Sequence, residues 1–199
     1  MAKSQYVNKL YVDKYYKHDN ASYKLTDSVI VNTNNDYWYE VKSYMFVDDE
    51  YDYMADTTFC RLDIVCHAKR NTKGSDTSYV FINDNRWLRF NHGGFGFFTK
   101  YWEDSANIMF KQINVSKDIV ALAFRGFRDS AGLPELSVFI LKGRDITLVY
   151  NKEVDVSEII ENNGMTTYIL QDNWFRDDEE EFIPHLVKMV FGNGTITIE

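Results

Sequence analysis

Apolar and polar residues alternate with a period of two over most of the chain after residue 28. In residues 37–47 both alternating series contain aromatic side chains, as in a strand covered on both faces or packed at an interface. Such alternation is typical of β-strands and predicts a mainly β protein. A short apolar run at 29–31 precedes a turn-rich stretch, and further strands are predicted at 57–68, 79–82, 87–90, 107–115, 119–124, 136–141, 146–150, 166–170, 186–191 and 195–198.

Turn-forming residues separate several of these segments. Asn83–Arg86, Lys142–Asp145 and Gly192–Gly194 combine Asn, Asp and Gly in short stretches between apolar runs. These residues tolerate the backbone angles of tight reversals. Each stretch is therefore predicted to be a hairpin turn.

One segment has residues that commonly begin and end a helix. Asp155 is a suitable N-cap, Glu158 follows three residues later, and Gly164 is a suitable end. Together with the many short strands, this predicts an antiparallel β-sandwich or a partly closed barrel with one short helix and an N-terminal arm.

The first 27 residues differ from the rest of the chain. They are rich in Tyr and Lys, and their apolar residues fit a helical stripe and an extended arm about equally. We predict an N-terminal arm or short helix over 1–27 and a single β-rich domain over 28–199. The length of 199 residues fits one domain.

The charge is unevenly distributed. The net charge is −8; residues 1–100 contain 13 basic and 13 acidic side chains, whereas residues 101–199 contain 9 and 17. This acidic balance argues against a nucleic-acid partner, which needs a dense basic surface. A basic beginning and an acidic second half favour contacts between the halves or between copies of the chain.

The cysteines and the N-terminus favour a cytoplasmic location. Cys60 and Cys66, on one predicted strand, lie about 20 Å apart at roughly 3.3 Å per residue, too far for a disulfide. We expect two free, buried thiols in a reducing compartment. The N-terminus lacks the apolar core of a signal peptide, and no apolar run is long enough to span a membrane. Cytoplasmic synthesis without a membrane partner is the expectation.

Motifs that would indicate catalysis or metal binding are weak. The histidines lack metal-ligand spacing, and Gly93–Phe98 lacks the strand and helix that flank a phosphate-binding loop. The acidic residues between 48 and 56 are suited to calcium, but they lack EF-hand spacing, and a solvated loop is the favoured interpretation. A non-enzymatic protein with no cofactor and no metal site is therefore predicted.

The leading functional hypothesis is a structural or assembly protein that acts through protein–protein contacts. We expect it to associate with itself as a homo-oligomer or with other assembly subunits. High Asn, Asp, Tyr and Lys with two Pro is typical of proteins from AT-rich genomes, including many bacteriophages, so a virion component is one version of the hypothesis. The predicted interface residues are Tyr6, Tyr11, Tyr15, Lys14, Lys17, Asp177, Asp178 and Glu179.

Two alternatives remain open. One is a β-sandwich that binds carbohydrate or another ligand, in which aromatic rings form a platform for the ligand. The candidate platform residues are Trp87, Tyr101, Trp102 and Trp174. The other is an enzyme whose pocket would hold His92 together with Glu103 or Asp84.

Overall fold

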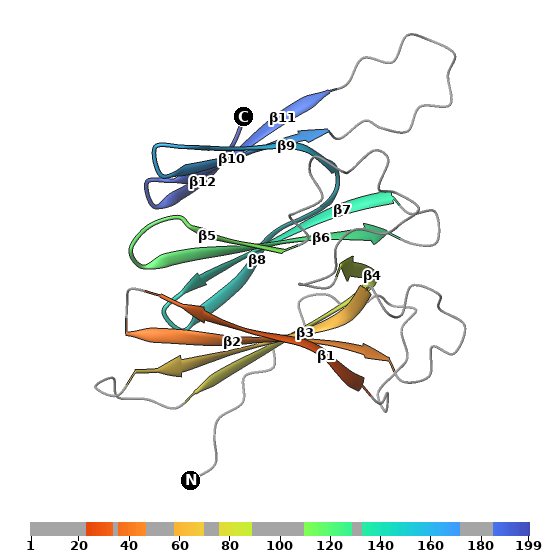
Figure 1. The fold of residues 1–199 in the computed structure, drawn as a ribbon, viewed down its shortest axis with the longest axis vertical. Helices are drawn as coiled ribbons and strands as arrows, with labels where there is room; N and C mark the ends of the chain where they lie inside the picture. Colours follow the sequence, from red (N-terminus) through yellow and green to blue (C-terminus); the bar gives the residue numbers. More distant parts are fainter. Residues whose placement is uncertain are drawn as a thin grey trace.

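A computed structural model describes residues 23–33, 36–46, 58–69, 76–88, 110–128, 133–171 and 185–199, and these residues are almost entirely β-strands (Figure 1). The predicted mainly β class is confirmed. The strands are β1 (Tyr23–Asn32), β2 (Tyr37–Phe46), β3 (Thr58–Ala68), β4 (Thr77–Leu88), β5 (Phe110–Asn114), β6 (Ile119–Arg128), β7 (Leu133–Lys142), β8 (Asp145–Glu153), β9 (Asp155–Asn162), β10 (Met165–Gln171), β11 (Leu186–Gly192) and β12 (Thr195–Ile198).

The strands form two antiparallel sheets. The larger sheet has the order β1-β2-β3-β4-β6-β7-β8, with β5 also paired to β6, and the smaller sheet has the order β12-β11-β10-β9. Within the described ranges, the end strands of neither sheet pair with each other, so neither sheet closes into a barrel. The layered arrangement in Figure 1 fits the sandwich alternative.

The larger sheet changes direction at β4. Arg61 of β3 pairs with Ile82 and Phe59 pairs with Trp87, so residues 83–86 of β4 lie opposite Cys60 alone. The end of β4 then pairs with β6 through Trp87–Gly126 and one neighbouring pair. This short junction lets β1–β4 pack over β6–β8 as a separate layer.

The predicted hairpin at Asn83–Arg86 is therefore wrong. β4 runs through these residues without reversing, and they form a wide bulge where the strand leaves β3 for β6. Asn and Asp favour irregular backbone in both situations. The position of the next partner strand determines whether the chain bends or turns back.

The first core lies between β1–β4 and β6–β8 and is rich in aromatic rings. Phe139 contacts Phe81 edge to face at 4.7 Å between ring centroids and Phe124 at 5.6 Å, and Phe124 contacts Phe59 at 6.0 Å. The Tyr39 hydroxyl donates to the Gly143 carbonyl at 2.6 Å. The first core comprises Val31, Tyr39, Val41, Met45, Phe59, Leu62, Ile64, Cys66, Phe81, Val120, Leu122, Phe124, Phe139, Leu141 and Ile146.

The second core lies between β5–β8 and the smaller sheet and is mainly aliphatic. It shares the middle layer with the first core, because alternate residues of β6 point to opposite sides. The β6 residues on this side are Ala121 and Ala123, whereas Leu122 and Phe124 face the first core. The second core comprises Ile113, Val115, Ala121, Ala123, Leu136, Val138, Val154, Val156, Tyr168, Leu170, Met189 and Phe191.

Three tight hairpins contain backbone angles that favour Gly or Asn. Gly143 has a φ of 59°, which confirms the predicted turn between β7 and β8. Asn193 and Gly194, with φ of 51° and 80°, confirm the predicted turn between β11 and β12. Asn163 and Gly164 repeat that pattern with φ of 50° and 76°.

The helix predicted to begin at Asp155 is wrong. Residues 155–162 form β9, which pairs with β10 along its whole length, and Gly164 belongs to the hairpin between them rather than to a helix end. Paired apolar residues such as Ile159 and Ile160 fit both periodicities over so short a segment. Pairing with β10 makes the segment a strand.

The boundary predicted for the N-terminal arm also changes. β1 begins at Tyr23, so residues 23–27 of the predicted arm belong to the larger sheet. Residues 1–22 lie outside the described part of the chain.

Candidate functional site

The residues predicted from the sequence to form interfaces or ligand platforms fall largely outside the described residues. Trp87 is described only by its backbone, which pairs with Gly126. The others outside the described part are Tyr6, Tyr11, Lys14, Tyr15, Lys17, Tyr101, Trp102, Trp174, Asp177, Asp178 and Glu179. The candidate sites below therefore consist of residues that sequence reasoning did not select.

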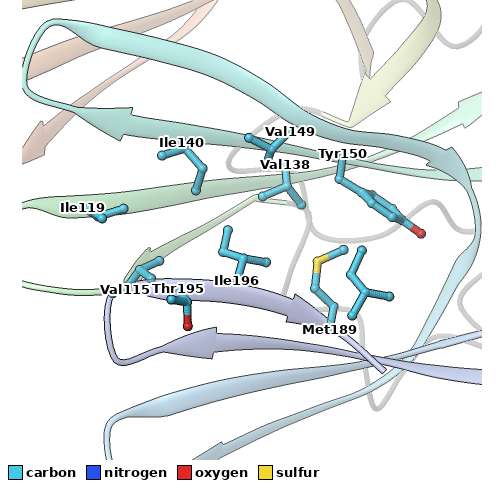
Figure 2. A pocket seen from close by; sticks show the side chains of 11 residues that line it. Val115, Ile119, Val138, Ile140, Val149, Tyr150, Met189, Thr195 and Ile196 are labelled. Atoms are coloured by element: carbon cyan, nitrogen blue, oxygen red, sulfur yellow. The ribbon is translucent and has the colours of Figure 1, made fainter.

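An apolar pocket of about 290 Å³ opens at the side of the second core, and we call it the open-side pocket. Figure 2 shows side chains of the middle layer and of β11–β12 facing one another across it. The lining residues are Val115, Ile119, Val138, Ile140, Val149, Tyr150, Met189, Gly194, Thr195, Ile196 and Ile198.

A bulge in β8 shapes one wall of this pocket. Val138 pairs with Tyr150 and Phe139 pairs with Leu148, which leaves Val149 without a partner in the register. Successive residues of a regular strand point to opposite faces, but a bulge breaks that rule. Val149 and Tyr150 therefore both line the pocket.

The pocket runs from the protein interior to the surface. Val138 and Met189 are fully buried at its inner end, whereas Val149 and Ile198 are about half exposed, at 50% and 54%, on end strands β8 and β12. The Thr195 hydroxyl donates to the Gly192 carbonyl at 3.2 Å. The lining therefore favours an apolar occupant.

One cation lies next to the pocket wall. The Lys152 ammonium is 5.7 Å from the centroid of the Tyr150 ring, and Lys152 is exposed. The structure gives Lys152 no ion pair with any described residue. A positive charge therefore lies beside a lining residue.

The outer face of β1–β4 is a second candidate surface, built around Trp38 and His67. These two residues are cross-strand partners, and their rings stack at 3.9 Å with an interplanar angle of 16°. The His67 Nδ1 atom lies 3.1 Å from an Asp76 carboxylate oxygen. Glu40 forms an ion pair with Lys42 at 2.9 Å on the same face, and this contact raises the pKa of Lys42.

Arg61 extends this surface toward the first residue of β1. Its guanidinium donates to both carboxylate oxygens of Asp63, at 2.7 and 2.8 Å. It also lies over the rings of Tyr23 and Tyr44, 4.8 and 5.2 Å from their centroids. The charges on this face are thus paired within the face, as on a solvated sheet surface.

A polar hollow of about 410 Å³ lies between β5 and the β9–β10 hairpin. Lys111 of β5 forms an ion pair with Glu161 of β9 at 2.5 Å beside it. Its walls include the exposed amides of Gln112, Asn114 and Asn163. Water can satisfy such groups, so the hollow gives no specific indication of a ligand.

An ion pair crosses the second core. The Arg125 guanidinium, almost fully buried on β6, donates to an Asp155 carboxylate oxygen on β9 at 2.6 Å. Burial lowers the pKa of Arg125, and the Asp155 carboxylate counteracts that effect. The Tyr168 hydroxyl nearby is buried without a hydrogen-bond partner, and burial raises its pKa.

The first core also contains polar groups at one end. Ser137 is fully buried, and its hydroxyl donates to the Asn151 side-chain carbonyl at 2.7 Å. The same hydroxyl lies 3.4 Å from an oxygen of Glu135, which is 3% exposed. These contacts join β7 to β8 on the side that faces β1–β4.

Neither Cys60 nor Cys66 forms a disulfide, and both side chains are buried, as predicted. The Cys66 thiol donates to the Gly143 carbonyl at 3.2 Å, and burial raises its pKa to about 12. A thiol needs to ionise to act as a nucleophile or metal ligand. Cys66 is therefore suited to packing rather than to chemistry.

Sequence reasoning missed the pocket residues, although one signal was present. Leu148, Val149 and Tyr150 form an apolar run that breaks the period of two within the predicted strand 146–150. Such a break is compatible with a bulge or with a strand covered on both faces. Choosing between them required the register of β7.

Within the described residues, no group of three or more His, Cys, Asp or Glu side chains is arranged to hold a metal ion, and no helix could span a membrane. Comparison with protein-family models, curated proteins and solved structures finds no match to this chain.

Proposed function

We propose that the protein is a non-enzymatic structural or assembly subunit that works through contacts with copies of itself or with other subunits. The observation that carries the proposal is the position of its exposed apolar side chains. Among the described residues, seven large apolar side chains are exposed, and five of them lie on end strands β1, β8, β9 and β12. They are Leu25, Ile30, Val149, Ile160 and Ile198.

β1 is the strand best suited to such a contact. Leu25 is 50% exposed and Ile30 is 58% exposed. A register shift after Leu25 places Leu25 opposite Tyr44 and Ile30 opposite Glu40, two β2 residues of the same outer face. Without that shift the two apolar side chains would point to opposite faces.

The backbone of β1 supports the same proposal. In the described part of the chain, the ten-residue strand pairs with β2 alone. The opposite edge of such a strand can pair with a strand of another chain, which is a common mode of protein association. A second copy or another subunit would add its strand there and cover Leu25 and Ile30.

The charge pattern of the sequence adds a second proposed contact. The lysines of residues 1–22 directly precede β1, and the acidic run at residues 177–181 is their natural electrostatic complement. We also propose, from composition alone, that the assembly is a bacteriophage virion. The carbohydrate alternative rests on Trp87, which is described only by its backbone, and on three platform residues outside the described part.

The solution mass of the purified chain, measured by light scattering behind a sizing column, tests the proposal. We expect a discrete oligomer that Ile30→Lys shifts toward the monomer, because a charge at that position opposes strand pairing. The matched control is Met165→Lys, since Met165 is 37% exposed but lies on inner strand β10, between Asn162 of β9 and Gly192 of β11. A monomer at every concentration, or equal effects of both variants, contradicts the proposal.

Removing residues 1–22 tests the electrostatic contact separately. The deletion stops short of Tyr23, so β1 remains intact. We expect weaker association at low salt and a smaller difference at high salt, where the contribution of the lysines is screened. Unchanged association would remove these residues from the proposal and leave β1 as the contact.

A further inference from the structure

We propose that the open-side pocket binds an aliphatic chain that ends in a carboxylate. The chain would lie between β8 and β12, and the carboxylate would pair with Lys152. The site uses none of the β1 residues of the proposed contact, although two of the exposed end-strand residues named there, Val149 and Ile198, line it.

The walls of the pocket favour a hydrocarbon chain. Val138, Met189 and Ile196 present methyl, methylene and thioether groups, and none of the lining residues is charged. A sugar or another polyol would leave its hydroxyls without partners there, which is costly for buried polar groups. Transfer of a hydrocarbon chain from water into this lining is favourable because it removes apolar surface from water.

The size and shape of the pocket limit the chain. Its volume of about 290 Å³ is at the lower end for small-molecule sites. Facing sheets in a sandwich are about 10 Å apart and side chains fill most of that gap, so the pocket admits one extended chain at most. A medium-length acyl chain fits this space better than a fused-ring compound.

Lys152 determines the head group. Its ammonium lies over the ring of Tyr150, a lining residue, and no described carboxylate pairs with it. An acyl chain in the pocket would place its polar end in water at the open side of the sandwich, the side on which Lys152 lies. A carboxylate there gains a favourable interaction with the ammonium, whereas an alcohol gains less and an amine is repelled.

The chemical class can be tested by isothermal titration calorimetry of the full chain with decanoate, decanol and decylamine. We expect decanoate to bind about threefold to fivefold more tightly than decanol at low salt, as an exposed ion pair allows. Lys152→Ala should abolish that preference and leave decanol binding unchanged. Equal affinities for decanoate and decanol in the unmodified protein would overturn the head-group assignment.

The location can be tested by filling the pocket. Val149 is half exposed, so Val149→Trp can occupy the pocket entrance without overpacking the buried end. We expect at least a tenfold loss of decanoate affinity. Ile160→Trp is the matched control, because Ile160 is 41% exposed on end strand β9 and does not line the pocket.

Circular dichroism with thermal unfolding shows whether both tryptophan variants are folded. If Val149→Trp does not fold, Ile198→Trp replaces it, since Ile198 lines the same entrance from β12. Decanoate binding that survives both pocket substitutions, or no binding of decanoate or decanol to the unmodified protein, overturns the proposal.

Discussion

The two cores of this protein differ although they share the same middle layer. The first core is closed by interlocked rings, and its Tyr39 hydroxyl is satisfied by the Gly143 carbonyl. The second core is aliphatic, contains the Arg125–Asp155 ion pair and an unpartnered Tyr168 hydroxyl, and opens into a pocket. The first core is therefore closed, whereas the second core is open at one side.

The difference begins with alternate residues of β6. The large side chains of Leu122 and Phe124 face β1–β4, whereas the small side chains of Ala121 and Ala123 face the smaller sheet. Because a strand presents successive residues to opposite faces, one segment can contribute large side chains to one core and small side chains to the other. Four predictions test this difference, from the largest expected effect to the smallest.

Truncating the ring at the centre of the first core should have the largest effect. Phe139→Ala should lower the free energy of unfolding by about 4 kcal/mol, because two edge-to-face ring contacts are lost and a cavity remains. Met189→Ala should cost about 2 kcal/mol, since Met189 borders a pocket that is already open. Urea unfolding measures both, and equal losses would contradict a difference in packing.

The buried ion pair should be the most sensitive point of the second core. Asp155→Ala should lower stability by about 3 kcal/mol, because it leaves the Arg125 guanidinium buried without its carboxylate. The double variant Arg125→Met, Asp155→Ala should be more stable than Asp155→Ala alone. Chemical denaturation compares the two variants. A double variant less stable than Asp155→Ala would show that the unpaired charge of Arg125 does not cause the loss of stability.

Stability should fall as the pH rises above about 9. Burial raises the pKa of the Cys66 thiol to about 12 and also raises the pKa of Tyr39 and Tyr168. These groups keep their protons in the folded chain, whereas in the unfolded chain they lose them from about pH 9 upward, so rising pH favours unfolding. The contribution is fully present below pH 8 and is lost progressively toward about pH 12.

The loss between pH 8 and pH 10 should be roughly 1 to 2 kcal/mol, measured by urea unfolding at each pH. Cys66→Ala is the control that should reduce the slope, because it removes the thiol that ionises first. An unchanged slope would assign the effect to other groups. At pH 8 Cys66 of the folded protein should also react slowly with a thiol reagent, since burial raises its pKa and little of it is present as thiolate.

Removing a single hydroxyl from each core should have the smallest and most diagnostic effects. Tyr39→Phe should cost about 1 kcal/mol, because it leaves the Tyr39 hydrogen bond to the Gly143 carbonyl unmade. Tyr168→Phe should be neutral or slightly stabilising, since that hydroxyl is buried without a partner. Thermal unfolding of both variants checks the contrast, and a cost at Tyr168 equal to that at Tyr39 would contradict it.

The sequence by itself determined the mainly β class, two of the hairpins and the burial of the cysteines. The period of two identified strands such as β2 and β12, because a half-buried strand must alternate wherever it pairs. Asn193-Gly194 identified a hairpin because few other residues adopt positive φ at low cost. The alternation also placed both thiols in the interior.

Only the tertiary structure decided where these elements bend and what they enclose. Residues 83–86 became a bulge rather than a hairpin because β6 offered the next partner, and residues 155–162 became a strand because β10 paired with them. The pocket formed because the register of β7 turned Val149 and Tyr150 to one side. Local preferences are set by neighbouring residues, whereas register, layer order and cavities depend on partners distant in the chain.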